Sequence, residues 1–286
     1  PVHGLQLGSR LRKLCVPLAL SAYLRSGLVT LEQFLIPWGL ARAGGSEEAS
    51  MAAYGTIHAM VFPILMFPAA ILYTVADLLV PELARCRAEE NTARIHHLTG
   101  TCLRMGLLFA LAAACLMGAL SGGLGQLIYK NADCGHYLLV FAPSVVMLYL
   151  DAMVDGMLKG FGEQTACVRY NVFTSVLDVA LLYLLLPRFG MMAYVLTFYF
   201  THAVNFWLSL HRLLRVTGYR LDGKFLPRAV FCALSGLGGS CCLPDGGLLP
   251  AMVLRAGLFG SVFSLFLELT DTVPAEDHRW LRRSLR

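Results

Sequence analysis

Charged residues are scarce in this sequence. Asp, Glu, Lys and Arg make up 14% of the 286 residues, while apolar residues make up 57% and the mean hydropathy is +0.64. An ordinary soluble domain carries about 25% charged residues. The composition therefore lies outside the range of ordinary soluble domains and predicts an integral membrane protein.

Motifs that support catalysis are missing as well. The sequence has no GxxxxGK[ST] nucleotide-binding loop and no HExxH or GxSxG motif, which argues against ATP hydrolysis and hydrolase chemistry. Its nine cysteines form no CxxC pair and have no histidine at metal-ligand spacing. We therefore expect a protein that is not an enzyme and that has no disulfides, metal site or cofactor.

Long apolar runs recur along the whole chain. Each is roughly 20 residues long, which is enough for an α-helix to cross about 30 Å of hydrocarbon. The sequence therefore predicts an all-α, polytopic membrane helix bundle with about eight transmembrane helices. The predicted spans are residues 14–40, 54–83, 97–121, 137–160, 167–187, 190–214, 225–243 and 247–270.

Lys and Arg are unevenly shared between the two sides of these spans. One side collects most of the 23 basic residues, and the other has only Arg42, Lys130 and Arg188. Because cytoplasmic loops are enriched in Lys and Arg, we expect both ends of this chain to be cytoplasmic. The net charge of +5 then reflects topology and contact with anionic membrane lipids, and we expect no nucleic-acid partner.

Two charges lie deep in the first predicted span. Arg25 is near its middle, and Glu32 follows two helical turns later on the same face. An ionised side chain at the bilayer centre costs about 2.5–3.5 kcal/mol on insertion scales. Two interpretations stay open: the pair satisfies partners inside the bundle, or it lines a water-filled cavity.

The second predicted span contains three prolines, Pro63, Pro68 and Pro81. Each proline removes a backbone hydrogen bond and bends or interrupts the helix. Asp77 lies in the same span, and the sequence leaves open whether it serves packing or function.

The segment LYLDAMVDGMLKGFGEQ, residues 148–164, places three charges at four-residue steps on one helix face. Asp155 and Lys159 are predicted to form an ion pair at the cytoplasmic boundary or to serve a gate. Asp151 lies one turn deeper and is a candidate for a cavity wall. Asp178 and Asn205, in the next two spans, are typical of interhelical hydrogen bonds worth about 1 kcal/mol, and Asn205 is also a candidate cavity residue.

Residues 125–190, with LDxxxDGMLKGxGEQ and LLPRFG, carry a family resemblance. The run resembles the stage V sporulation protein B family of polysaccharide and lipid-linked oligosaccharide exporters. That family belongs to a superfamily that includes lipid II flippases and multidrug and toxin extrusion transporters. The resemblance is looser but continuous from about residue 10 to 216.

The resemblance implies an architecture of two six-helix lobes, with two extra helices at the C-terminal end. This chain matches the second lobe and the extra pair, and we expect it to be the later part of a longer protein that supplies the first lobe. The implied division is an inter-lobe linker (1–13), the second lobe (14–216), two additional helices (217–270) and a basic cytoplasmic tail (271–286).

The resemblance also implies a function. A flippase in the cell membrane would move a lipid-linked oligosaccharide or cell-wall polysaccharide precursor from the cytoplasmic to the outer leaflet by alternating access. Its pyrophosphate head group would contact Arg25, and the lipid tail would stay in the bilayer. The implied cavity or gate residues are Glu32, Asp77, Asp151, Asn205, Asp155 and Lys159.

Two alternatives remain open. A cation-coupled multidrug extruder of the same superfamily would use buried carboxylates, such as Asp77, Asp151 and Asp178, to bind Na⁺ or H⁺. A truncated lobe would act only as a membrane scaffold, without transport.

Overall fold

The computed structural model describes residues 3–43, 46–243, 249–270 and 272. All regular structure in this part of the chain is helical. In order, the segments are α1 (His3–Arg42), α2 (Glu47–Thr56), the π-helical segment η1 (Ile57–Val61), α3 (Phe62–Met66), α4 (Ala69–Ala88), α5 (Thr92–Tyr129), α6 (Ala132–Phe141), α7 (Ser144–Gly160), α8 (Gln164–Phe189), α9 (Met191–Thr217), α10 (Phe225–Cys241) and α11 (Leu249–Leu269).

Several of these helices are suited to a bilayer. Four segments in the described residues are long and apolar enough to cross a membrane, and α6 with α7 adds a fifth if the bent pair is one span. The four are Glu48–Met66, Thr92–Tyr129, Gln164–Phe189 and Leu249–Leu269. The chain is therefore a membrane-embedded helical bundle. Each of the eight predicted spans lies mainly on helical residues, although residues 247 and 248 of the last one are outside the described part of the chain. The crossings beyond these five stay predictions.

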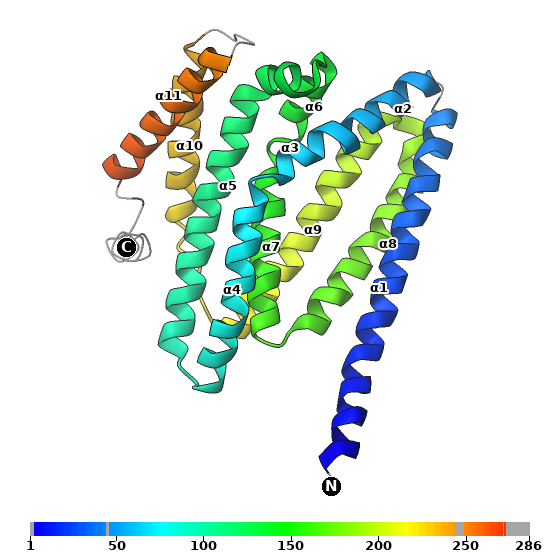
Figure 1. Cartoon of the computed structure of the whole chain (residues 1–286), viewed down its shortest axis with the longest axis vertical. Coiled ribbons are helices and arrows are strands. Elements are labelled where there is room, and N and C mark those ends of the chain that lie inside the picture. The colour runs from blue at the N-terminus through cyan, green and yellow to red at the C-terminus, as the bar shows by residue number, and fades with distance from the viewer. Residues whose placement is uncertain (1–2, 44–45, 244–248, 271, 273–286) are drawn as a thin grey trace.

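The long helices lie side by side, with their connections at the two ends of the bundle (Figure 1). α1 packs on α8, α8 on α9, α9 on α7, and α7 on both α4 and α5. α10 and α11 pack on each other and on α5. The predicted second lobe would take in α1–α9 and the predicted additional pair α10 and α11, and this division stays a prediction.

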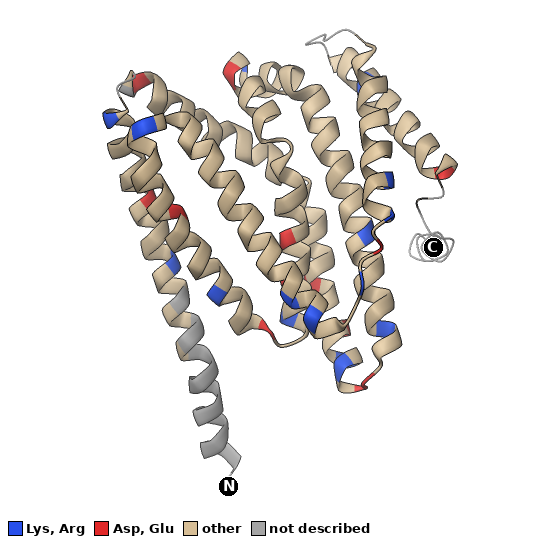
Figure 2. Cartoon of the chain, turned by 180° about the vertical axis from the view of Figure 1, so that it is seen from behind, with Lys and Arg blue, Asp and Glu red and all other residues tan. Residues whose placement is uncertain are grey.

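Basic residues concentrate at one end of the bundle, where α4 meets α5, α7 meets α8 and α9 ends (Figure 2). The last turns of these helices contain Arg85, Arg87, Lys159 and Arg215. We call this the basic end. The opposite end carries Arg42, Lys130 and Arg188. The predicted charge split is therefore a property of the fold, while the side of the membrane that each end faces stays a prediction.

Two predicted spans are broken at prolines. The span 54–83 is interrupted after α3 by a turn at Phe67 and Pro68, and 137–160 is divided at Pro143, where α6 and α7 meet at 57°. Proline has no backbone N–H, and its ring clashes with the preceding turn, so the helix cannot continue straight. The predicted span 137–160 is therefore two helices that meet at an angle, a break that the sequence analysis did not predict, and the pair counts as one crossing if the bent pair is one span. Pro81, in contrast, lies inside an unbroken α4.

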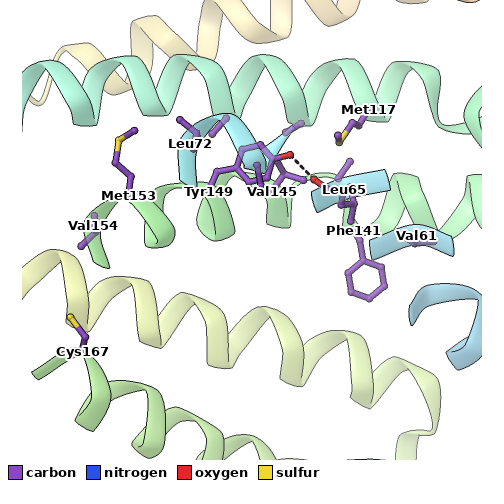
Figure 3. Close-up of a cluster of buried hydrophobic side chains, with 14 of the residues drawn as sticks. Val61, Leu65, Leu72, Met117, Phe141, Val145, Tyr149, Met153, Val154 and Cys167 are labelled. Atoms are coloured by element: carbon purple, nitrogen blue, oxygen red, sulfur yellow. Dashed lines mark hydrogen bonds between the residues drawn. The ribbon is translucent and has the colours of Figure 1, made fainter. Parts of the chain in front are cut away.

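The core lies where these breaks meet α5 (Figure 3). Tyr149 of α7 is 1% exposed, and its hydroxyl donates a hydrogen bond to the backbone carbonyl of Leu65 in α3. Phe141, at the end of α6, is fully buried in the same cluster. The side chain of Tyr149 therefore ties one broken span to the other.

α4 and α7 approach each other closely at Gly156. A Cβ atom on Gly156 would lie 2.6 Å from the Cβ of Ala76, which is closer than real Cβ contacts. Only glycine permits this spacing, as small residues do at helix interfaces in membranes. The contact holds the polar face of α4, with Asp77, beside the polar face of α7.

The predicted domain boundaries fall at different kinds of position. α1 is one helix from His3, so residues 13 and 14 lie inside it without a break. α9 ends at Thr217, next to the predicted boundary at 216, and Gly218 terminates it with φ +68°. Apart from Thr272, the predicted tail (271–286) lies outside the described residues.

Candidate substrate cavity

A cavity of about 430 Å³ lies among α1, α4, α7, α8 and α9. Its volume is within the range of about 300–1,000 Å³ that is usual for small-molecule sites. α1 contributes Arg25 and Glu32, and α4 contributes Tyr73 and Asp77. The remaining lining comes from α7, α8 and α9. An apolar bundle thus encloses a polar hollow.

All seven residues predicted for the cavity or gate line this hollow: Arg25, Glu32, Asp77, Asp151, Asp155, Lys159 and Asn205. The structure therefore brings them together from four helices, although their roles stay predictions. Arg25, Asp77 and Lys159 are exposed, whereas Glu32, Asp151 and Asp155 are partly buried. Asn205 is buried, with 7% of its surface exposed.

The sequence analysis missed the polar stripe of α8. Asn171, Thr174 and Ser175 line the cavity beside Asp178. Their spacing of i, i+3, i+4 and i+7 places all four on one helix face. This helical spacing of polar residues is visible in the sequence and could have identified Asn171, Thr174 and Ser175 as cavity residues.

A hydrogen-bond network joins three helices at the floor of the cavity. The amide Nδ2 of Asn205 donates to Asp151 Oδ2 at 2.8 Å, and its Oδ1 accepts from Thr174 Oγ1 at 3.4 Å. The one hydroxyl proton of Thr174 is shared, because the carbonyl of Tyr170, one turn back in α8, lies 3.0 Å from the same oxygen. α7, α8 and α9 are therefore fixed to one another by the residues that line the cavity.

A second contact joins α8 to α9 beside Glu32 of α1. Thr201 Oγ1 donates to Asp178 Oδ1 at 3.0 Å. Glu32 and Asp178 line the same part of the cavity, from α1 and α8. Arg25 lines the cavity from the same face of α1 as Glu32, and Asp151 lines it from α7. α1 therefore lines the cavity with charged groups.

Toward the basic end, Asp155 accepts a hydrogen bond from Ser209 Oγ at 3.5 Å. Lys159 acts on Asp155 electrostatically, but the ion pairs within 4 Å in the described residues do not include these two. The predicted pairing is thus a longer-range interaction in this structure, and a gate role stays a prediction.

A smaller cavity of about 150 Å³ lies on the other side of Glu32, Asp178 and His202, which line both hollows. Its remaining lining is mainly aromatic and apolar: Ile36, Tyr54, His58, Phe62, Leu182, Tyr194 and Phe198. His58 Nε2 and the Tyr194 hydroxyl are 2.8 Å apart and hydrogen-bonded. The two cavities therefore differ in chemistry, one polar and one aromatic.

Carboxyl groups outnumber basic groups in the larger cavity. Arg25 and Lys159 face Glu32, Asp77, Asp151, Asp155 and Asp178. Within the described residues, no group of three or more His, Cys, Asp or Glu side chains has the arrangement of metal ligands. The site is therefore acidic on balance.

Comparison with known proteins gives one distant similarity. The chain is 20% identical over 184 residues to the sporulation protein YkvU of Bacillus subtilis (strain 168). The match covers 64% of this chain and 41% of that protein, so this chain spans less than half of the relative's length. No protein-family model matches the chain. The similarity is compatible with the predicted family resemblance and does not by itself assign the family.

Proposed function

We propose that the chain forms one wall of the pathway of a membrane flippase, which moves a lipid-linked oligosaccharide or cell-wall polysaccharide precursor by alternating access. The observation that carries the proposal is the polar cavity inside an apolar bundle. Ionisable residues at membrane depth are costly, and they mark pathways for substrates and ions. The substrate moves without a change in its covalent bonds, so the protein is not an enzyme.

The substrate divides into a polar head group and a lipid tail. The head group crosses through the cavity while the tail stays in the bilayer. Arg25 contacts the pyrophosphate, because a guanidinium matches phosphate geometry and Arg25 is exposed in the cavity. Glu32, Asp77, Asp151 and Asn205 form the wall of the pathway. Asp155 and Lys159, near the basic end, serve the gate.

The partner of this wall is the first lobe of the same transporter. α1 and α4, which flank the cavity, expose large apolar side chains, among them Tyr23 (78%), Phe34 (72%) and Leu78 (69%), and Phe67 (83%) is exposed in the turn before α4. A second lobe and membrane lipids would cover these surfaces. The match covers only 41% of the similar Bacillus subtilis protein, which leaves room for a further lobe in that protein.

The basic end faces the cytoplasm in this proposal, since cytoplasmic loops are enriched in Lys and Arg. Both ends of the chain are then cytoplasmic, and transport runs from the cytoplasmic to the outer leaflet of the plasma membrane. A role in sporulation or cell-wall synthesis is part of the proposal, supported by the name of the similar protein.

Transport in proteoliposomes tests this function. The native protein that contains this chain is reconstituted with a fluorescent polyprenyl pyrophosphate carrying a disaccharide, and the label in the outer leaflet is quenched with dithionite. We expect protein-dependent flipping that falls about ten-fold or more in Asp151→Ala, a loss of about 1.4 kcal/mol of transition-state stabilisation. Ser261→Ala on exposed α11, where the hydroxyl bonds only its own helix, is the control and should leave the rate unchanged. Absence of flipping by the wild-type protein contradicts the proposal.

The acidic balance of the cavity favours one other function, cation-coupled export of an organic cation. Asp77, Asp151 and Asp178 would then bind Na⁺ or H⁺ and the cationic substrate. Export of ethidium that depends on a sodium or proton gradient, without movement of the lipid-linked sugar, would establish this alternative in place of the flippase.

A further inference from the structure

The part of the cavity formed by α7, α8 and α9 differs chemically from the side that carries Arg25. We call it the α7–α9 wall and define it by six residues: Asp151, Asp155, Asn171, Thr174, Ser175 and Asn205. These side chains offer two carboxyl groups, two amides and two hydroxyls. Lys159, one turn beyond Asp155 on α7, also lines the cavity but lies toward the basic end, so the six residues of the wall are acidic or uncharged.

Asn205 is the centre of this wall. It is more than nine-tenths buried, and it is held on both sides, by Asp151 of α7 and by Thr174 of α8. Because its amide group already bridges two partners from other helices, its orientation is fixed before a ligand arrives. Groups that are positioned in advance lose little entropy on binding.

Asp151 has one satisfied and one unsatisfied oxygen. Oδ2 accepts from Asn205, whereas Oδ1 is buried and has no hydrogen-bond partner among the described residues. Buried acceptors without a donor are rare and costly in folded proteins. Because Asp151 lines the cavity, this unsatisfied acceptor lies directly behind the cavity surface.

We infer that the α7–α9 wall binds the sugar part of the substrate, through the hydroxyl and amide N–H donors of the sugar, while the pyrophosphate lies at Arg25. This inference rests on the proposed flippase function and assigns the two parts of the head group to different sides of one cavity. Sugar hydroxyls both donate and accept hydrogen bonds, so they match a wall that mixes carboxyl, amide and hydroxyl groups.

The same wall is unsuited to the pyrophosphate. The carboxylates of Asp151 and Asp155 would repel the negatively charged pyrophosphate, and this repulsion is strong in a site of low dielectric. The wall is also unlike a site for an organic cation, which is commonly recognised on aromatic faces. Most aromatic rings near Glu32 line the smaller cavity instead, among them Tyr54, Phe62 and Tyr194.

Binding of two matched probes tests the assignment. The native protein in lipid nanodiscs is titrated with a polyprenyl pyrophosphate that carries a disaccharide and with the same lipid without sugar. Asp151→Ala and Asn205→Ala should weaken binding of the sugar-bearing probe about ten-fold, as expected for loss of a hydrogen bond to a charged or preoriented group. Their Kd for the sugarless probe should stay within about two-fold of the wild-type value. Arg25→Ala should weaken binding of both probes by the same factor.

Ser175→Ala is a milder variant that keeps the fold, because it removes only one cavity-lining hydroxyl of α8. It should weaken binding of the sugar-bearing probe and leave binding of the sugarless probe unchanged. Equal weakening of both probes by Asp151→Ala, or unchanged sugar binding in Asn205→Ala and Ser175→Ala, would overturn the inference while leaving the flippase function intact. Failure of the wild-type protein to bind or move either lipid probe would instead overturn the proposed function.

Discussion

The hydroxyl of Tyr149 provides a direct test of how the broken spans are held. Tyr149 is 1% exposed and donates to the carbonyl of Leu65, which is fully buried. Leu65 lies three residues before Pro68, where the turn at Phe67 and Pro68 interrupts the helix. Tyr149→Phe keeps the ring and its packing, so it isolates the loss of this one donor.

The expected loss of unfolding free energy follows from two general ranges for hydrogen bonds. A buried acceptor that loses its donor costs about 1–3 kcal/mol, while side-chain hydrogen bonds within membrane helices average about 0.6 kcal/mol and reach about 1.7. We therefore expect Tyr149→Phe to lower the free energy of unfolding by about 1–2 kcal/mol. For a chain of this size that corresponds to a decrease in Tm of about 2–8 °C.

The assay is thermal unfolding of the native protein in detergent, followed by far-UV circular dichroism. Tyr199→Phe is the matched comparison, because the Tyr199 hydroxyl donates at 2.7 Å to Val140, three residues before Pro143. Tyr199 is only partly buried, so its loss should cost less. Tyr183→Phe, at an exposed ring, sets the baseline. If Tyr149→Phe unfolds at the same temperature as Tyr183→Phe, the hydroxyl does not stabilise the break.

Three further predictions concern other parts of the bundle. Gly156→Val should lower the free energy of unfolding by about 1–3 kcal/mol in the same assay, because its Cβ would overlap Ala76; unchanged stability would show that α4 and α7 can separate freely. Arg255→Leu should destabilise the packing of α11 on α5 and increase proteolysis of the C-terminal helices, since Arg255 is 7% exposed and donates to backbone carbonyls; resistance equal to wild type would contradict this. Cys241 and Cys242 are exposed at the end opposite the basic end, so a membrane-impermeant maleimide should label them in intact cells and not from the cytoplasmic side of inverted vesicles; the reverse pattern would invert the proposed orientation.

Much of the fold could be predicted from the sequence, because a bilayer imposes a simple rule on helix length. Apolar runs of about 20 residues located the helices, and the basic residues indicated which helix ends lie together at one end of the bundle. The break at Pro143 was missed although the proline was visible, because hydropathy does not distinguish a straight span from a bent one. Pro81 shows the converse, since it lies in an unbroken helix.

The candidate site could be predicted only in part. The four-residue spacing of Asp151, Asp155 and Lys159 fixed one helix face, and the structure places that face in the cavity. It could not reveal that Asn205 of α9 would pair with Asp151, because contacts between helices depend on which faces pack together. Apolar faces in a membrane carry little information on that choice, since lipid and protein are similarly apolar.

The packing divides the walls of the cavity into two pairs of helices. α4 and α7 are held together at Gly156, and α1 packs on α8 along its length. The cavity lies between these pairs, with Asp77 and Asp155 on one and Glu32 and Asp178 on the other. The Tyr149 hydroxyl bonds the backbone just before the break that precedes α4, and the Tyr199 hydroxyl bonds the backbone just before the break that precedes α7. The bend angle at the start of each of these two helices therefore depends on a tyrosine hydroxyl. A change in either bend would shift α4 and α7 against α1, and because the Asp151–Asn205 hydrogen bond ties α7 to α9, the change would also strain that bond and alter the shape of the cavity. We therefore expect Tyr149→Phe to alter the transport rate as well as stability, while leaving every group that contacts the substrate in place.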